Sequence, residues 1–243
     1  MKPKILIVGD SCLDVYSYCS ASRLAPDKPV PVLEVLSRTE TPGMAYNVFC
    51  NVESLGVFCD IETNLNWKEV IKNRYVHSSS NHMFMRVDAT SSIERIDVTK
   101  LSLDYETIIV SDYDKGFLLE DDIEYLCSNH PQVILDTKKI LDTWAMNAKF
   151  IKINNHEFDR SKKFIENNMK SKIIQTMGGD GCFYGGKLYP VEKMDVIDVS
   201  GAGDSFMAAL CVKFTHTKNI EQSIEFANQC ASEVVKHRGT TII

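Results

Sequence analysis

The sequence predicts an α/β protein with a doubly wound, mostly parallel sheet, helices on both faces and a small antiparallel β lid. Three observations support this fold. Apolar runs alternate with segments of helical periodicity through the second half of the chain. Polar or glycine residues follow these runs directly, as they do at the carboxyl ends of parallel strands. Near the N-terminus, three prolines in a polar stretch favour an edge ribbon over a central strand.

The first elements combine a buried strand with an excursion from the sheet. Residues 5–8 are a continuous apolar run that ends in a Gly-Asp pair, which fits a strand buried on both faces. Residues 15–18 and 30–36 look like strands that flank the proline-rich stretch. We therefore expect an antiparallel excursion at about residues 12–38, either a lid or a dimer contact, within a single domain over residues 1–243.

The remaining elements follow from spacing and from residues that end helices. Apolar residues at helical spacing predict a helix over residues 44–55, and Gly56 suits the end of that helix. The pattern of residues 57–95 is weaker, with short strands expected at 57–61 and 82–88 and a weak helix between them. The other expected strands are residues 107–111, 133–135, 150–153 and 172–176. The other expected helices are residues 120–129, 156–168, 201–216 and 220–236, with a small hairpin at 181–190.

Composition excludes several classes of protein. The net charge of −6 over 243 residues leaves no basic surplus to neutralise a nucleic-acid backbone, so we expect no nucleic-acid partner. No apolar run approaches the roughly 20 residues of a membrane span, and the first residues lead into a strand rather than a signal peptide. We therefore expect a cytoplasmic protein with no membrane partner. The eight cysteines are scattered without metal-ligand spacing and are expected to be reduced.

The most informative motif is Gly201-Ala202-Gly203-Asp204, which apolar residues at helical spacing follow. Glycines at a helix N-terminus let free amides approach an anion closely, and the helix dipole favours the negative charge. Asp204 would lie beside that anion, where a carboxylate can take a proton from an attacking hydroxyl. The motif therefore suggests a phosphoryl-transfer site. The alternative is a glycine-rich turn that Ser200 caps.

Polar clusters also follow the other expected strands. Because the carboxyl ends of parallel strands meet at one edge of a sheet, we expect these clusters to lie close together. They are Asp10 with Asp14, and residues 111–116, 136–138, 154–157 and 176–181.

This set of motifs, in this order, resembles the ribokinase-like (PfkB) family of sugar kinases, in which a Gly-Ala-Gly-Asp motif supplies the anion hole and the catalytic base. Within the family the chain is most similar to the kinase domain that phosphorylates D-glycero-D-manno-heptose 7-phosphate at its anomeric hydroxyl. The resemblance implies an enzyme that uses ATP and Mg²⁺ and phosphorylates a small sugar or sugar phosphate. The stretches that carry it most specifically are residues 9–16, 22–32, 111–116 and 226–228.

The resemblance also implies roles for individual residues. Asp204 would be the base, and the backbone of Gly201, Ala202 and Gly203 would form the anion hole. The implied nucleotide-binding residues are Asn154, Glu157, Thr176, Gly178, Gly181 and Asn228. Of these, Glu157 would organise magnesium through water. For Asn154 and Glu157, the alternative is an N-cap with an acidic residue in the first turn.

On the sugar side, a carboxylate and an amide suit the hydroxyls of a polyol. The implied substrate-binding residues are Asp14, Gly43, Asn47, Lys115 and Lys138. The two lysines would hold a substrate phosphate or the phosphates of ATP. Arg23 and Arg86 are further candidates for a sugar phosphate, with an ordinary surface role as the alternative.

Two departures from the family concern the sugar side. Met44 stands where the family has the second glycine of a pair, so either the backbone differs there or a side chain enters the pocket. The stretch between Gly56 and Ser111 is shorter than in the heptose kinases. The alternatives are therefore a kinase for a fructose- or ribose-type sugar, and a noncatalytic sugar- or nucleotide-binding relative. Because the excursion exposes apolar strand residues, we also expect a homodimer that pairs through the lid.

Overall fold

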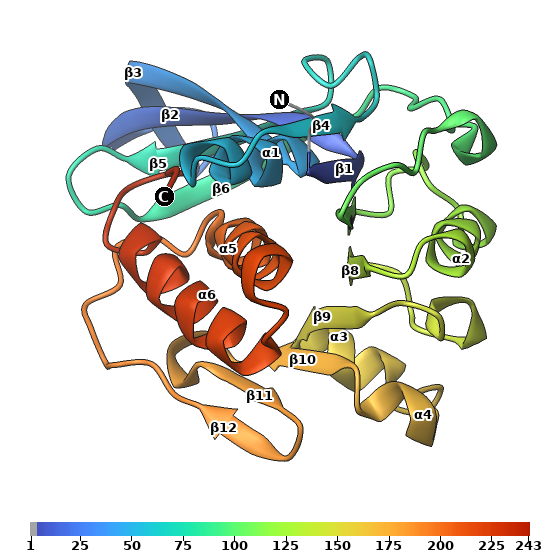
Figure 1. Cartoon of the computed structure of the whole chain (residues 1–243). Helices are drawn as coiled ribbons and strands as arrows, with labels where there is room; N and C mark the ends of the chain where they lie inside the picture. The colour runs from blue at the N-terminus through green and yellow to red at the C-terminus, as the bar shows by residue number, and fades with distance from the viewer. Residues whose placement is uncertain (1–3) are drawn as a thin grey trace.

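The structure, a computed structural model, describes residues 4–243, so residues 1–3, at the expected start of the domain, lie outside it. Its main sheet has eight strands in the order β12-β11-β10-β9-β8-β7-β1-β4 (Figure 1). The pairings from β4 to β10 are parallel, and β11 and β12 add an antiparallel hairpin at one edge. The strands are β1 (Ile5–Gly9), β4 (Cys59–Glu62), β7 (Thr107–Asp112), β8 (Val133–Thr137), β9 (Phe150–Asn154), β10 (Ile173–Thr176), β11 (Cys182–Tyr184) and β12 (Lys187–Tyr189).

Helices cover both faces of this sheet, as the sequence predicts. The α-helices are α1 (Ala45–Ser54), α2 (Glu120–Asn129), α3 (Asn155–Ser161), α4 (Asn167–Lys170), α5 (Ala202–Thr217) and α6 (Ile220–Val234). Alternate residues of β1 enter two different cores, because successive side chains of a strand point to opposite faces. Ile5 and Ile7 pack with α1, α5 and α6, whereas Leu6 and Val8 pack with α2. The α/β class and the two covered faces are therefore confirmed.

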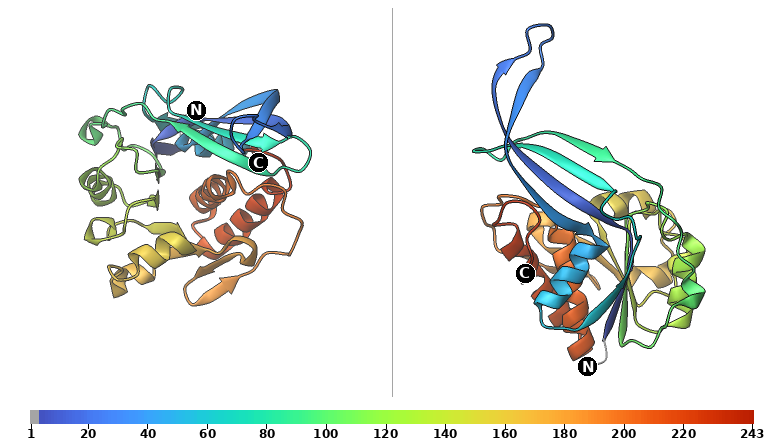
Figure 2. Two further views of the ribbon diagram at one scale, coloured as in Figure 1. Left: turned by 180° about the vertical axis from the view of Figure 1, so that it is seen from behind. Right: turned by 90° about the horizontal axis from the view of Figure 1, so that it is seen from above.

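The lid is a separate sheet of four strands in the order β3-β2-β5-β6. The expected antiparallel hairpin at 12–38 is present, but it is longer, and its far end projects from the molecule (Figure 2). The weak helix expected between residues 61 and 82 is wrong, because β5 pairs along β2 in parallel and with β6 in antiparallel fashion. The strands are β2 (Ser11–Leu24), β3 (Pro31–Met44), β5 (Ile71–His77) and β6 (Met83–Ala89).

One further expectation needs correction. Residues 156–168 form two short helices, α3 and α4, instead of one. The chain turns after Ser161, where Phe164 and Ile165 donate backbone hydrogen bonds to the Ser161 carbonyl. This turn lets Ile165 and Met169 both enter the core on the α2 side. Within residues 4–243, no helix has the length and apolar character needed to cross a bilayer.

Candidate active site

The N-terminus of α5 presents free backbone amides. Gly201 is its N-cap, with a left-handed φ of 80°, and no side chain caps the helix, so the expectation that Ser200 caps the turn is wrong. The first helical bond runs from Ser205 N to Gly201 O at 2.9 Å. The amides of Gly203 and Asp204 precede that bond and have no helical acceptor. Ala202 N instead donates to Val199 O at 3.2 Å, so it is less available to an anion than the sequence suggests.

Asp204 lies in the first turn of α5, with a side chain that is largely buried. Its Oδ2 accepts a hydrogen bond from Asn47 Nδ2 at 2.9 Å, and its Oδ1 accepts one from the Tyr113 hydroxyl at 2.5 Å. Asn51 Nδ2 donates to Asn47 Oδ1 at 3.1 Å and so fixes the orientation of that amide. Burial raises the pKa of the Asp204 carboxyl above its ordinary value, although both hydrogen bonds oppose the shift.

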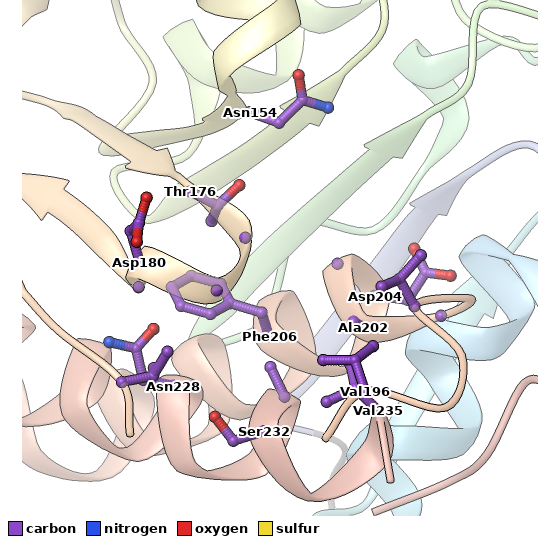
Figure 3. Close-up of a pocket in the computed structure, with 18 of the residues that line it drawn as sticks. Asn154, Thr176, Asp180, Val196, Ala202, Asp204, Phe206, Asn228, Ser232 and Val235 are labelled. Atoms are coloured by element: carbon purple, nitrogen blue, oxygen red, sulfur yellow. The ribbon is translucent and has the colours of Figure 1, made fainter. Parts of the chain in front are cut away.

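A cavity of about 780 Å³ extends from Asp204 across the carboxyl ends of β9 and β10. Figure 3 shows Asp204 at one end of the cavity and Asp180 and Asn228 at the other. Thr176, Gly178 and Gly181, which the sequence predicts for a nucleotide site, all line the cavity.

Two residues at the far end of the cavity hold its wall in place. Gly181 has a φ of 92°, and a Cβ there would lie 2.1 Å from the Tyr189 carbonyl oxygen, so only glycine fits. Asn228 is buried and donates to the same Tyr189 oxygen at 2.9 Å. Its amide nitrogen therefore fastens β12 to α6 beside the cavity.

Asn154 and Glu157 form a capping box at the start of α3. Glu157 N donates to Asn154 Oδ1 at 2.9 Å, and Asn154 N donates to Glu157 Oε2 at 2.8 Å. The N-cap alternative is therefore present in the structure. Glu157 Oε1 also accepts a bond from Lys138 Nζ at 2.5 Å, so both of its oxygens have protein partners.

Two lysines and a buried aspartate lie next to this box. Lys138 and Lys152 both line the cavity. Lys152 Nζ is 2.6 Å from Asp136 Oδ2 and 3.3 Å from the position that a Cβ on Gly203 would occupy. Burial alone would lower the pKa of Lys138, but Asp136 and Glu157 outweigh it and raise that pKa. The cavity wall beside the α5 amides therefore carries two lysine side chains, each paired with a carboxylate.

On the lid, Asp14 is buried and accepts a hydrogen bond from the Arg74 guanidinium. Gly43 lies beside it on β3, and a Cβ at Gly43 would be 2.3 Å from Asp14 Oδ2. Glycine at this position therefore leaves room for the carboxylate. Asp14 and Gly43 are not among the residues that line the cavity described above.

Met44 ends β3 and precedes α1, with a φ of 62° and a ψ of −133°. This region of backbone space is sparsely populated by residues other than glycine. The Met44 side chain is 2% exposed and packs with Cys12 and Val70, and Tyr113 lies against the same cluster. The backbone thus keeps the kind of conformation that glycine favours, while the side chain fills space next to the residue that holds Asp204.

Several expected phosphate-binding residues lie away from the cavity. Lys115 is exposed in the loop after β7 and does not line it. Arg23 is exposed on the lid, and exposed Arg86 donates to Asp88 at 2.8 and 3.0 Å. Within residues 4–243, no group of three or more His, Cys, Asp or Glu side chains could hold a metal ion by itself.

The sequence did not single out three residues that the structure brings to the site. Tyr113 lies within the polar cluster 111–116 but was assigned no role of its own. Lys152 is a charge inside an apolar strand, and such a charge needs a buried partner. Arg74 lies in the stretch whose pattern was weak, so no signal was available for it.

Residues 59–243 match the pfkB family carbohydrate kinases. The bifunctional protein HldE of Blochmanniella pennsylvanica is 29% identical over 294 residues, which cover 99% of this chain and 61% of the relative. HldE of Campylobacter jejuni strain RM1221 is 27% identical, with 100% of this chain and 63% of the relative covered. The chain thus spans about three-fifths of the length of these relatives. The first alignment is longer than the 243-residue chain, so parts of the relative have no counterpart here.

Solved structures share the fold. A nucleoside kinase from Methanocaldococcus jannaschii has a TM-score of 0.72 and 17% identity, with 98% of this chain and 93% of that chain covered. Ribokinase from Thermotoga maritima has a TM-score of 0.72 and 16% identity, with 98% and 95% covered. At such identities the likeness concerns the fold, whereas the family match extends over about three-quarters of the sequence. The chain therefore belongs to the pfkB family of carbohydrate kinases.

Proposed function

We propose that this protein transfers the γ-phosphate of ATP to the anomeric hydroxyl of a heptose 7-phosphate. The observation that carries the proposal is the position of Asp204, a buried carboxylate at the helix N-terminus where a glycine- and lysine-lined cavity ends. The similarity to HldE proteins over almost the whole chain supports the choice of acceptor.

ATP suits the cavity in size and chemistry. The cavity volume of about 780 Å³ falls within the range of about 300–1,000 Å³ for small-molecule sites. We place the adenine toward Asn228 and the ribose and phosphates along Thr176, Gly178 and Gly181. Lys138 and Lys152 then lie near the phosphates, where two ammonium groups offset their negative charge.

The chemistry follows from the surroundings of Asp204. The acceptor hydroxyl takes the place of the Tyr113 hydroxyl at Asp204 Oδ1, and Asn47 holds the other oxygen in position. Asp204 accepts the proton while the acceptor oxygen attacks the γ-phosphorus and the bond to the leaving ADP oxygen breaks. The amides of Gly203 and Asp204 donate to the transferred phosphoryl group. On the sugar side, Asp14 accepts hydrogen bonds from substrate hydroxyls.

Magnesium fits this site through water and phosphate oxygens rather than through a cage of protein ligands. Glu157 and Asp136 are the acids beside the lysines; Asp136 Oδ1 makes no hydrogen bond, but it forms an ion pair with Lys138 Nζ at 3.7 Å. When bound, the ion would supply positive charge to the ATP phosphates. We assign Glu157 the role of holding its water ligands.

The test is turnover of ATP with Mg²⁺ and a panel of sugars. We expect turnover with heptose 7-phosphate, and Asp204→Asn should lower kcat by about 10²- to 10⁴-fold, as for loss of a general base. Asp195→Asn is a matched control, because Asp195 is exposed in the segment before α5 and outside the cavity lining. Equal turnover of several unphosphorylated sugars would favour a fructose- or ribose-type kinase. Turnover no greater than that of Asp204→Asn would favour a noncatalytic binding protein.

We also propose a homodimer that pairs through the lid. The β2–β3 hairpin projects from the molecule (Figure 2). It exposes apolar side chains, among them Leu24 at 61% and Leu36 at 57%. An exposed apolar strand surface of this kind is stabilised when a second copy covers it. We expect Leu36→Glu to yield monomers in sedimentation experiments, whereas Leu188→Glu, on the other sheet, should leave the dimer intact. A wild-type monomer at high concentration contradicts the proposal.

A further inference from the structure

Two cationic side chains share one face of the lid. Lys72 and Arg74 lie two positions apart on β5, so they leave the same face of the sheet. The parallel register places Lys72 beside Asp14 and Arg74 beside Tyr16 of β2. The Arg74 guanidinium donates to Asp14 and lies 5.2 Å from the centre of the Tyr16 ring. The face of the lid that carries Asp14 therefore also carries these two cationic side chains, and Arg86 of β6 shares that face but is paired with Asp88.

This face is turned toward the base. Lys72 Nζ lies 5.0 Å from the centre of the Tyr113 ring, and the hydroxyl of that ring donates to Asp204. Lys138 Nζ lies 5.1 Å from the same ring but belongs to the nucleotide cavity, where it binds Glu157. Tyr113 thus contacts one ammonium that lines the nucleotide cavity and one that the lid supplies from the acceptor side.

The ammonium of Lys72 lacks a counter-ion. It makes no hydrogen bond or ion pair with any residue from 4 to 243, although its side chain is half-buried. Asp88 is its cross-strand neighbour on β6, but that carboxylate accepts two bonds from Arg86. A partly desolvated cation whose ring contact brings no negative charge is unfavourable by itself and favours the binding of an anion.

We propose that Lys72, together with Arg74, binds a phosphate group that the acceptor already carries, so that this chain selects phosphorylated over unphosphorylated sugars. The inference rests on the proposed function, because it concerns the acceptor of that reaction. A sugar phosphate anchored on the lid would extend its far hydroxyl toward Asp204, while Asp14 accepts bonds from the hydroxyls between them. Charge-assisted bonds to phosphate are about twice as strong as neutral ones, which suits this discrimination.

The test compares two acceptors, heptose 7-phosphate and the same heptose without phosphate. In Lys72→Gln, kcat/KM for heptose 7-phosphate divided by kcat/KM for the unphosphorylated heptose should fall about 10- to 100-fold. Most of the change should be a higher KM for the phosphorylated sugar. Arg38→Gln is a matched control, because Arg38 pairs with Ser17 and so lies on the other face of the lid. It should keep the wild-type ratio. A wild-type ratio in Lys72→Gln overturns the inference.

Binding without turnover separates this inference from the proposed function. Titration calorimetry with heptose 7-phosphate, without ATP, measures the contact directly, and a thermal melt checks that Lys72→Gln is folded. If wild type binds about 10- to 100-fold more tightly than Lys72→Gln but shows no turnover, the phosphate site stands and the kinase proposal fails. Equal affinity in the two proteins, or no binding to wild type, overturns the phosphate site even where turnover is seen.

Discussion

Met44 offers a direct test of the backbone on the acceptor side. Its φ of 62° and ψ of −133° should strain any residue with a Cβ by about 1–3 kcal/mol, whereas glycine tolerates them. Its buried side chain also packs with Cys12 and Val70, so substitution has two opposing effects. Met44→Ala removes the packing and keeps the strain, and Met44→Gly removes both.

The magnitudes give an unusual order of stability. Met44→Ala should lower the free energy of unfolding by about 2–5 kcal/mol, as expected for truncation of a buried methionine. Met44→Gly loses the same packing and about 0.5–1 kcal/mol more through the entropy of the unfolded chain, but it recovers the strain. The glycine variant should therefore be more stable than the alanine variant by about 1 kcal/mol.

Urea unfolding followed by circular dichroism measures this difference. Val48, which is fully buried in α1, provides the matched control pair. At that helical position, Val48→Gly should be less stable than Val48→Ala by about 1 kcal/mol, the ordinary order. If Met44→Gly is less stable than Met44→Ala, as for the two Val48 variants, the backbone at position 44 is not strained.

Three further outcomes are expected. Because burial raises the pKa of Asp204, the loss of kcat/KM toward acid pH should have its midpoint above about 3.9, the pKa of a free aspartate. A midpoint at or below that pKa contradicts the prediction. Gly181→Ala would place a Cβ 2.1 Å from the Tyr189 carbonyl oxygen and should lower the melting temperature more than Gly185→Ala, whose Cβ meets no atom within 4 Å. Equal decreases in melting temperature would show that the cavity wall relaxes around the new Cβ. Arg238→Ala removes two hydrogen bonds to backbone carbonyls of the β5–β6 turn and should speed amide hydrogen exchange in that turn. Unchanged exchange would show that these hydrogen bonds do not stabilise the turn.

The centre of the main sheet could be predicted because β1, β7, β8 and β9 are largely apolar runs buried on both faces, and each ends in a glycine or polar residue. The lid could be predicted only in part. β5 alternates apolar and charged residues weakly, and its partner β2 lies more than fifty residues earlier in the chain, so local periodicity carried little signal. Residues 156–168 have helical character, but the positions that must reach the core, Ile165 and Met169, require the break between α3 and α4.

The sequence predicted which polar clusters gather at one edge of the sheet, but not the contacts between their side chains. The polar clusters after the strands do meet at one edge of the sheet, and the glycines of α5 precede Asp204 as expected. Asn47 was expected to contact the sugar, whereas the structure places its amide on Asp204. The role of Lys152 could not be predicted because Ile151 and Ile153 flank it in an apolar run. Such contacts depend on the packing of α1, β9 and α5, which spacing along the chain does not reveal.

The bond between Tyr113 and Asp204 has a consequence for the idle enzyme. A kinase whose base is open to solvent can pass the γ-phosphate to water and hydrolyse ATP without product. Here water must compete with the Tyr113 hydroxyl at 2.5 Å and the Asn47 amide at 2.9 Å for the carboxylate oxygens. A whole sugar brings binding energy from its other groups to displace the tyrosine, and a water molecule does not. With Asp204 as the proposed base, the resting arrangement would favour productive transfer over futile hydrolysis of ATP.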